Sequence, residues 1–304
     1  MKFIYSFFFF FAIGTIHSQS IQSPSKSIKL SFNLADNGKP NFSVTYKNKA
    51  IILQSFLEIK IKTGIDLTSN FRIEDSKTST FNETWKPVLG EQATISNHYN
   101  ELKVSLSQTK ANVKMNIIFR VFDEGVAFRY DFPKQQNLNY FIVSDEVSEF
   151  NLAGNHKVFW IPGDFDSNEY AYNETTFSDN NNKKIDLNNG IGVKSISGKY
   201  TVQSPLMMKT ADNIYLNIFE AAVVNYPLMH LDADVTRFKL KSHLVPNAIG
   251  DKAYLQAACV SPWRTIMISD DARDIVSSKM ILNLNEPSKI DDTSWIKPMK
   301  YVGV

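Results

Sequence analysis

One short segment near the middle of the chain gathers many potential ligands. Gly163 to Tyr170, read as GDFDSNEY, holds three carboxylates, a hydroxyl and an amide. Oxygen donors of these kinds bind hard cations, and Ca²⁺ takes about six to eight of them. They can also orient a sugar, or they can belong to a solvated loop in which Asp and Asn favour turns. The spacing of Asp164, Asp166 and Glu169 is not that of an EF-hand loop, so the residues by themselves leave all three interpretations open.

Other polar or aromatic candidates favour structural roles. Glu220 lies among apolar neighbours, which predicts a buried carboxylate paired with an arginine rather than a second metal ligand. Trp160 is expected to fill the core, whereas Tyr170 is a candidate for stacking on a sugar. His98 is a candidate for orienting a sugar hydroxyl, although a structural histidine is the simpler interpretation. Three further histidines show no metal spacing among themselves: His156, His230 and His243.

Composition excludes several classes of function. The formal net charge is +2 and the basic residues are scattered, so no electrostatic footprint for nucleic acid is present. Cys259 is the only cysteine, which excludes an internal disulfide and a thiolate metal cluster. Its apolar neighbours predict a buried structural thiol. The sequence shows neither a Ser-His-Asp arrangement nor a phosphate-binding loop.

The N-terminus is typical of a signal peptide. Lys2 precedes an apolar stretch from Phe3 to Ile16, and the small residue Ser18 suits a cleavage site. This stretch is shorter than the roughly 20 apolar residues that a membrane span needs. We therefore expect residues 1–18 to be removed, with the mature protein exported to the periplasm or secreted and without a membrane span.

Period-two alternation of apolar residues dominates the mature chain and predicts strands with one buried face. A hairpin is expected where Met115 to Val121 and Val126 to Phe132 flank a turn that ends at Gly125. Many strands with few helices predict an all-β protein, a large antiparallel sandwich over residues 19–285. Other elements are expected at three places: a helix over Asp271 to Ser278, a strand over Met280 to Leu284, and a polar surface loop over Tyr172 to Gly190.

The end of the sequence has a pattern of its own. Tyr301 to Val304 looks like the start of an apolar strand, and an unfinished strand exposes unpaired backbone. We expect residues 286–304 to be a linker and the first strand of a further domain that this sequence lacks.

Several of these stretches also carry a family resemblance. They are Asn97 to Leu102, Phe119 to Tyr130, Phe159 to Asp164, Ser261 to Ile266, Ile281 to Lys289, Trp295 and Tyr301 to Val304. Together they resemble the N-terminal part of glycoside hydrolase family 97, a family of exported α-glycoside hydrolases.

The resemblance implies a mutarotase-like β-super-sandwich that precedes a (β/α)₈ catalytic barrel, whose first strand would begin at Tyr301. It implies that the acid and base carboxylates lie on the barrel, so no catalytic residue is expected in this chain and the isolated chain is not expected to hydrolyse glycosides. It also implies one functional residue here. Glu169 would give a carboxylate to a calcium ion whose other ligands belong to the barrel. Asp164 and Asp166 are expected to be structural, orienting the loop or capping strand ends.

Two functions from different classes remain. In the first, the chain is the accessory, carbohydrate-binding part of an exported calcium-dependent α-glycosidase that acts on α-linked oligosaccharides, either glucosides or galactosides. In the second, it is a stand-alone carbohydrate-binding β-sandwich without catalytic activity. A reading frame that continues past Val304 into a barrel favours the first, and a stop codon favours the second.

Overall fold

The computed structural model describes residues 19–62, 64–181, 195–300 and 302–303. The expected signal peptide, two residues of the expected barrel strand (Tyr301 and Val304) and most of the second half of the expected loop lie outside this range. None of the helices within it is long and apolar enough to cross a membrane.

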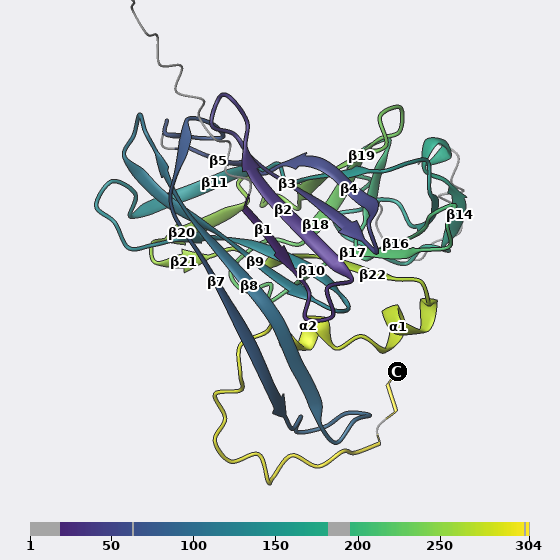
Figure 1. Ribbon diagram of the computed structural model, residues 1–304. Coiled ribbons are helices and arrows are strands. Elements are labelled where there is room, and N and C mark those ends of the chain that lie inside the picture. The colour runs from purple at the N-terminus through teal and green to yellow at the C-terminus, as the bar shows by residue number, and fades with distance from the viewer. Residues whose placement is uncertain (1–18, 63, 182–194, 301, 304) are drawn as a thin grey trace, which may run out of the picture.

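Two large antiparallel sheets form the two layers of the molecule (Figure 1). The eight-stranded sheet contains, in spatial order, β1 (Gln19–Gln22), β2 (Ile28–Leu34), β3 (Pro40–Tyr46), β4 (Lys49–Phe56), β12 (Glu149–Leu152), β19 (Lys239–Leu244), β18 (Met229–Asp234) and β15 (Thr201–Gln203). The ten-stranded sheet contains β14 (Asn173–Thr176), β13 (Lys157–Trp160), β16 (Leu206–Lys209), β17 (Tyr215–Ala221), β22 (Trp263–Ser269), β10 (Gly125–Phe132), β9 (Val113–Phe122), β8 (Ile95–Gln108) and β7 (Phe71–Trp85), with β21 (Cys259–Val260) paired to β10.

A third, smaller sheet lies beside these layers. Its strands, in spatial order, are β20 (Ala253–Gln256), β11 (Tyr140–Glu146), β5 (Ile59–Ile61) and β6 (Asp66–Leu67). The short helical elements are η1 (Phe177–Asp179), α1 (Ala272–Ser277) and α2 (Met280–Asn283). The predicted all-β sandwich and the predicted hairpin of β9 and β10 are confirmed.

The main core lies between the two large sheets, where alternate residues of most strands point inward. Phe32 and Phe42 from the eight-stranded sheet meet Phe119 and Phe128 from the ten-stranded sheet, with ring centroids 5.7 Å apart for Phe32–Phe119 and 5.1 Å for Phe42–Phe128. All four side chains are fully buried. Because the rings meet in tilted arrangements, they add to the stability that burial of apolar area provides.

The prediction of a strand over Met280 to Leu284 is wrong, because the segment forms α2. In a helix, residues four apart share one face, so Met280 and Leu284 both pack on a second apolar cluster at the outer face of the ten-stranded sheet. Asn283, on the same helix, accepts a hydrogen bond from Trp85 Nε1 at 2.9 Å and donates to the Ser96 carbonyl at 2.9 Å. The nearby helix α1 is close to its expected position, and Asp271 caps it.

The expected loop over Tyr172 to Gly190 is partly wrong as well. Residues 173–176 form β14, an edge strand that pairs with β13, and η1 follows it directly. Phe177 explains why this polar segment has regular structure: its side chain is buried, and its backbone N–H donates to the His156 carbonyl at 2.8 Å. One apolar anchor is enough to order a polar segment.

Candidate functional site

The GDFDSNEY segment leaves the end of β13 and runs beside β15. The Gly163 N–H donates to the Thr201 carbonyl at 2.7 Å, and the Ser197 N–H donates to the Gly163 carbonyl at 2.8 Å. A Cβ atom at Gly163 would lie 2.5 Å from Ser197 Oγ and 2.6 Å from Thr201 Cγ2. Glycine is therefore required here, because any side chain would push the segment away from the sheet.

Asp164 organises the turn that follows. Its Oδ1 accepts the backbone N–H groups of Asp166 at 2.8 Å and Ser167 at 3.1 Å, and its Oδ2 accepts the N–H of Ser195 at 3.0 Å and the hydroxyl of Tyr170 at 2.5 Å. Charge-assisted hydrogen bonds of this kind are stronger than neutral ones. The carboxylate is buried and acts as a structural hub, as the sequence suggested.

Ionisation strengthens this hub. Burial by itself would raise the pKa of Asp164, but the hydrogen bonds from Tyr170 and from the backbone outweigh it and hold the pKa below its ordinary value. Burial and the Asp164 carboxylate raise the pKa of the Tyr170 hydroxyl, so this group stays a neutral donor. The Tyr170 hydroxyl is thus committed to Asp164 and does not need a sugar as its partner.

The other two carboxylates of the segment have different surroundings. Asp166 accepts a hydrogen bond from Ser195 Oγ. Glu169 is exposed, and its backbone N–H donates to Ser167 Oγ at 3.1 Å. Among the described residues, no side chain or backbone group pairs with the Glu169 carboxylate. Glu169 is thus presented to solvent by a turn that Asp164 holds in place.

A pair of histidines lies beneath the segment. His230 of β18 and His243 of β19 are directly opposite each other in the antiparallel pair. The Phe165 ring is stacked on both imidazoles, with centroids 6.0 Å from His230 and 5.8 Å from His243 and interplanar angles of 9° and 11°. Asp232 accepts from His243 Nδ1 at 2.8 Å and from the Thr201 hydroxyl. This cluster supports the segment from below.

Sequence reasoning missed this supporting cluster. His230 and His243 are too far apart in the chain to form a local motif, and only the register of two strands brings them together. Burial and the neighbouring His243 lower the pKa of His230 to about 4, so His230 is neutral at pH 7.

The described residues offer few free oxygen donors for a calcium ion. Within the described part of the chain, no group of three or more His, Cys, Asp or Glu side chains could hold a metal. The Asp164 oxygens are taken up by the turn, and Ca²⁺ needs six or more oxygens. The described residues of the segment therefore do not make a complete calcium site by themselves, and Glu169 is the exposed carboxylate that a ligand could reach.

The remaining sequence candidates lie apart from the segment or are buried. Trp160 is in the core and donates to Thr175 Oγ1 at 3.0 Å. His98 lies on β8, opposite Asn82 of β7. Glu220 is buried and pairs with Arg264 at 2.5 Å, which confirms the predicted arginine partner. The Cys259 thiol is only partly buried, and burial raises its pKa to about 11, so it is not a nucleophile at neutral pH.

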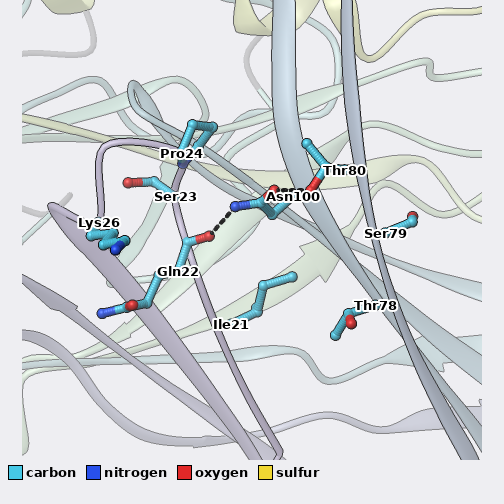
Figure 2. A pocket seen from close by; sticks show the side chains of 9 residues that line it. All are labelled: Ile21, Gln22, Ser23, Pro24, Lys26, Thr78, Ser79, Thr80 and Asn100. Carbon is cyan, nitrogen blue, oxygen red and sulfur yellow. Dashed lines mark hydrogen bonds between the residues drawn. The ribbon is translucent and has the colours of Figure 1, made fainter.

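A polar groove lies elsewhere, between the turn after β1 and the strands β7 and β8. Its volume is about 410 Å³. Figure 2 shows that the Asn100 side chain spans it, donating to the Gln22 carbonyl at 2.8 Å and accepting from Thr80 Oγ1 at 2.7 Å. Because these polar groups bond to one another, the groove does not present them to a ligand.

Comparison with known proteins gives a consistent picture. The family described as Glycosyl-hydrolase 97 N-terminal matches residues 21–287. A retaining alpha-galactosidase of Bacteroides thetaiotaomicron is 21% identical over 306 aligned positions, which cover 92% of this chain and 43% of that protein. A probable retaining alpha-galactosidase of Streptomyces bingchenggensis is 21% identical, with 87% of this chain and 37% of that protein covered.

Solved structures agree. A glycoside hydrolase family 97 enzyme of Pseudoalteromonas sp., in complex with acarbose, superposes with a TM-score of 0.81 at 31% identity, covering 92% of this chain and 40% of that chain. A beta-arabinopyranosidase shares the fold, with a TM-score of 0.73 at 19% identity, covering 86% of this chain and 42% of that chain.

This chain thus spans less than half the length of the relatives it matches. The family match covers most of the described sandwich. The chain belongs to the N-terminal domain family of glycoside hydrolase family 97.

Proposed function

We propose that this chain is the N-terminal accessory part of an exported, calcium-dependent α-glycosidase, in which Glu169 gives one carboxylate to the metal. The observation that carries the proposal is the turn held by Asp164. It leaves the Glu169 carboxylate exposed and, among the described residues, without a partner. A solvated carboxylate on a turn whose backbone is held in place suits a ligand that completes a site in a neighbouring domain.

The residues of this chain have separate tasks in that site. Asp164 fixes the turn, the Tyr170 hydroxyl donates a hydrogen bond to Asp164, and Phe165 anchors the turn on the histidine pair. Glu169 binds the ion. A bound calcium ion would supply a fixed positive charge to that site.

An α-linked oligosaccharide is the proposed substrate class. The curated relatives are named as retaining alpha-galactosidases, and a solved family 97 enzyme was captured with acarbose and, in another structure, with panose. These names include both galactosides and glucosides, so the proposal extends to α-glycosides of either sugar.

Glu169→Gln tests the proposal in the protein that also carries its catalytic domain. The substitution keeps the size of the side chain but removes its charge, and calcium affinity depends on the number of charged ligands. We expect calcium binding about tenfold weaker, equivalent to ~1.4 kcal/mol, with reduced turnover at limiting calcium. Calorimetric titration of calcium measures the first effect, and hydrolysis of aryl α-glycosides measures the second.

Glu174→Gln is the matched control. Glu174 is also a surface carboxylate near the segment, but it pairs with Lys157 at 2.5 Å. Its substitution should leave calcium affinity unchanged. Equal calcium affinity in the wild type and in Glu169→Gln would remove Glu169 from the site and leave the segment as a solvated turn.

A further inference from the structure

The small sheet exposes two tyrosines on one face. Tyr140 of β11 is 69% exposed and Tyr254 of β20 is 57% exposed, whereas the adjacent Phe141 and Leu255 are buried. Because successive side chains alternate between the faces of a strand, both tyrosines point away from the core. Exposed aromatic rings in such a cluster mark a binding surface more often than chance.

Strand register places polar groups beside the rings. Tyr140 is opposite Gln256, and Tyr254 is opposite Ile142. The Lys62 backbone N–H donates to the Ile142 carbonyl at 3.0 Å, which puts Lys62 at the end of the same row. Tyr140 and Tyr254 are therefore diagonal neighbours on the two strands, positions that are typically about 7–8 Å apart and within reach of aromatic side chains. Gln256 lies beside Tyr140 on the neighbouring strand. Ile142 of β11 lies between Tyr254 on one side and Lys62 on the other.

This face forms one side of an open pocket of about 590 Å³. Tyr140, Tyr254, Gln256 and Lys62 are among the residues that line it. That volume is within the range of about 300–1,000 Å³ that small-molecule sites have. Strands β20 and β11, which carry this face, are on the left of Figure 1, whereas β14, which follows the Glu169 turn in the chain, is on the right. The face is therefore separate from that turn.

Hydrogen bonds hold the Tyr254 side chain in place before any ligand arrives. Its hydroxyl donates to Asp251 Oδ2 at 2.7 Å and accepts from Asn247 Nδ2 at 3.3 Å. The ammonium group of Lys62 pairs with the other oxygen of Asp251. A ring fixed in this way loses little freedom on binding.

The chemistry of this face suits a sugar. A pyranose has an apolar C–H face, which packs on an aromatic ring, and a rim of hydroxyls, which need polar partners. Tyr140 and Tyr254 offer rings, and Gln256 and Lys62 offer donors and an acceptor around them. A stable protein partner would need about 800 Å² on each side with an apolar centre, and two rings among polar side chains do not provide that.

We propose that this face is a second carbohydrate site, separate from the Glu169 turn, which holds an α-linked oligosaccharide between Tyr140 and Tyr254. The choice of α-linked sugars rests on the proposed function. The assignment of a sugar site to this face does not, because it rests on the exposed rings and the polar groups around them. Binding here is proposed to need no metal, because none of the residues that line the face is acidic and the neighbouring Asp251 is buried and paired with Tyr254 and Lys62.

Calorimetric titration of the purified protein in the presence of EDTA tests this site. Maltoheptaose serves as the α-glucoside probe and stachyose as the α-galactoside probe, so the two titrations identify the sugar class. We expect one of them to bind, and we expect Tyr140→Ala and Tyr254→Ala each to weaken binding about tenfold. Tyr254→Phe keeps the ring and should stay within about twofold of the wild type.

Two controls separate this site from the proposed function. Tyr172→Ala removes a tyrosine that is 64% exposed but lies outside this face, and it should not change binding. Glu169→Gln should also bind the sugar normally, so failure of the calcium proposal does not affect this result. Absence of binding by both sugars overturns the site, as does binding that both alanine variants retain, or self-association of the protein that Tyr140→Ala abolishes.

Discussion

Replacing Arg264 by methionine should lower the free energy of unfolding by about 3–5 kcal/mol, the largest single effect that we expect in this molecule. Arg264 is fully buried between two carboxylates. Its Nε and Nη2 donate to Glu146 at 2.8 Å each, and its Nη1 donates to Glu220 at 2.5 Å. Removing the cation leaves two buried carboxylates without compensation.

The electrostatics of this group explain the size of the effect. Burial raises the pKa of Glu220, although Arg264 counteracts it, and Glu146 holds the pKa of Arg264 above its ordinary value against the cost of its own burial. The group also joins two sheets, since Glu146 ends β11 while Glu220 and Arg264 are opposite each other on β17 and β22. Its loss therefore loosens the contact between the small sheet and the ten-stranded sheet.

Urea denaturation of four variants separates lost charge pairing from lost packing: Arg264→Met, the double variant Glu146→Gln and Glu220→Gln, the triple variant, and Arg273→Met. Arg264→Met in a Glu146→Gln and Glu220→Gln background should cost much less than in the wild type, because no uncompensated charge remains. Arg273→Met is the matched control, since Arg273 is 89% exposed in its pair with Asp271 and its loss should change stability far less. A cost for Arg264→Met as small as that of Arg273→Met would contradict the account.

The sandwich could be predicted from the sequence because most of its strands have one buried face. The hairpin of β9 and β10 is the clearest case, since its alternating apolar residues flank a turn that ends at Gly125. Gly125 has a φ of 156°, and a Cβ there would lie 2.3 Å from the Ile266 carbonyl oxygen of β22. Local pattern and tertiary packing require the same residue at this position.

Two elements could not be predicted because tertiary structure determines them. Strand β7 is 15 residues long and almost wholly exposed, so it has no apolar alternation, and it is a strand because β8 pairs with it along its length (Figure 1). Helix α2 comes from an apolar run too short to show a period. Its apolar side chains pack on the second cluster at the sheet surface, and only the folded sheet provides that surface.

The candidate site was predictable only in part for a similar reason. The acidic segment is visible in the sequence, and Asp164 was expected to orient it. The support beneath it was not, because His230, His243 and Asp232 come together through strand pairing. The support also connects to the buried ion pairs, since Glu220 Oε1 accepts the Met229 N–H at 3.0 Å, one residue before His230.

Acidification from about pH 6.5 to about pH 4 should destabilise the protein because of His230. Burial and His243 lower the pKa of His230 from 6.5 to about 4, against the attraction of Asp164 and Asp232. In this pH window the unfolded chain binds a proton that the folded chain does not. The free energy of unfolding therefore falls as the pH falls, by about 3 kcal/mol in total, and levels off below the folded pKa.

His230→Phe should flatten this dependence, because phenylalanine can still stack on Phe165 but cannot take up a proton. The slope should not vanish, since burial also lowers the pKa of His156. Carboxylates with a lowered pKa, such as Asp164, begin to cost stability only below about pH 5, and Asp145 and Glu220, whose pKa is raised, change stability in the opposite direction. The difference between the wild-type and His230→Phe slopes therefore isolates His230. Urea denaturation of both proteins at several values between pH 7 and pH 4 measures the slope. A His230→Phe protein with the slope of the wild type would show that His230 takes up its proton in the folded state as readily as in the unfolded one.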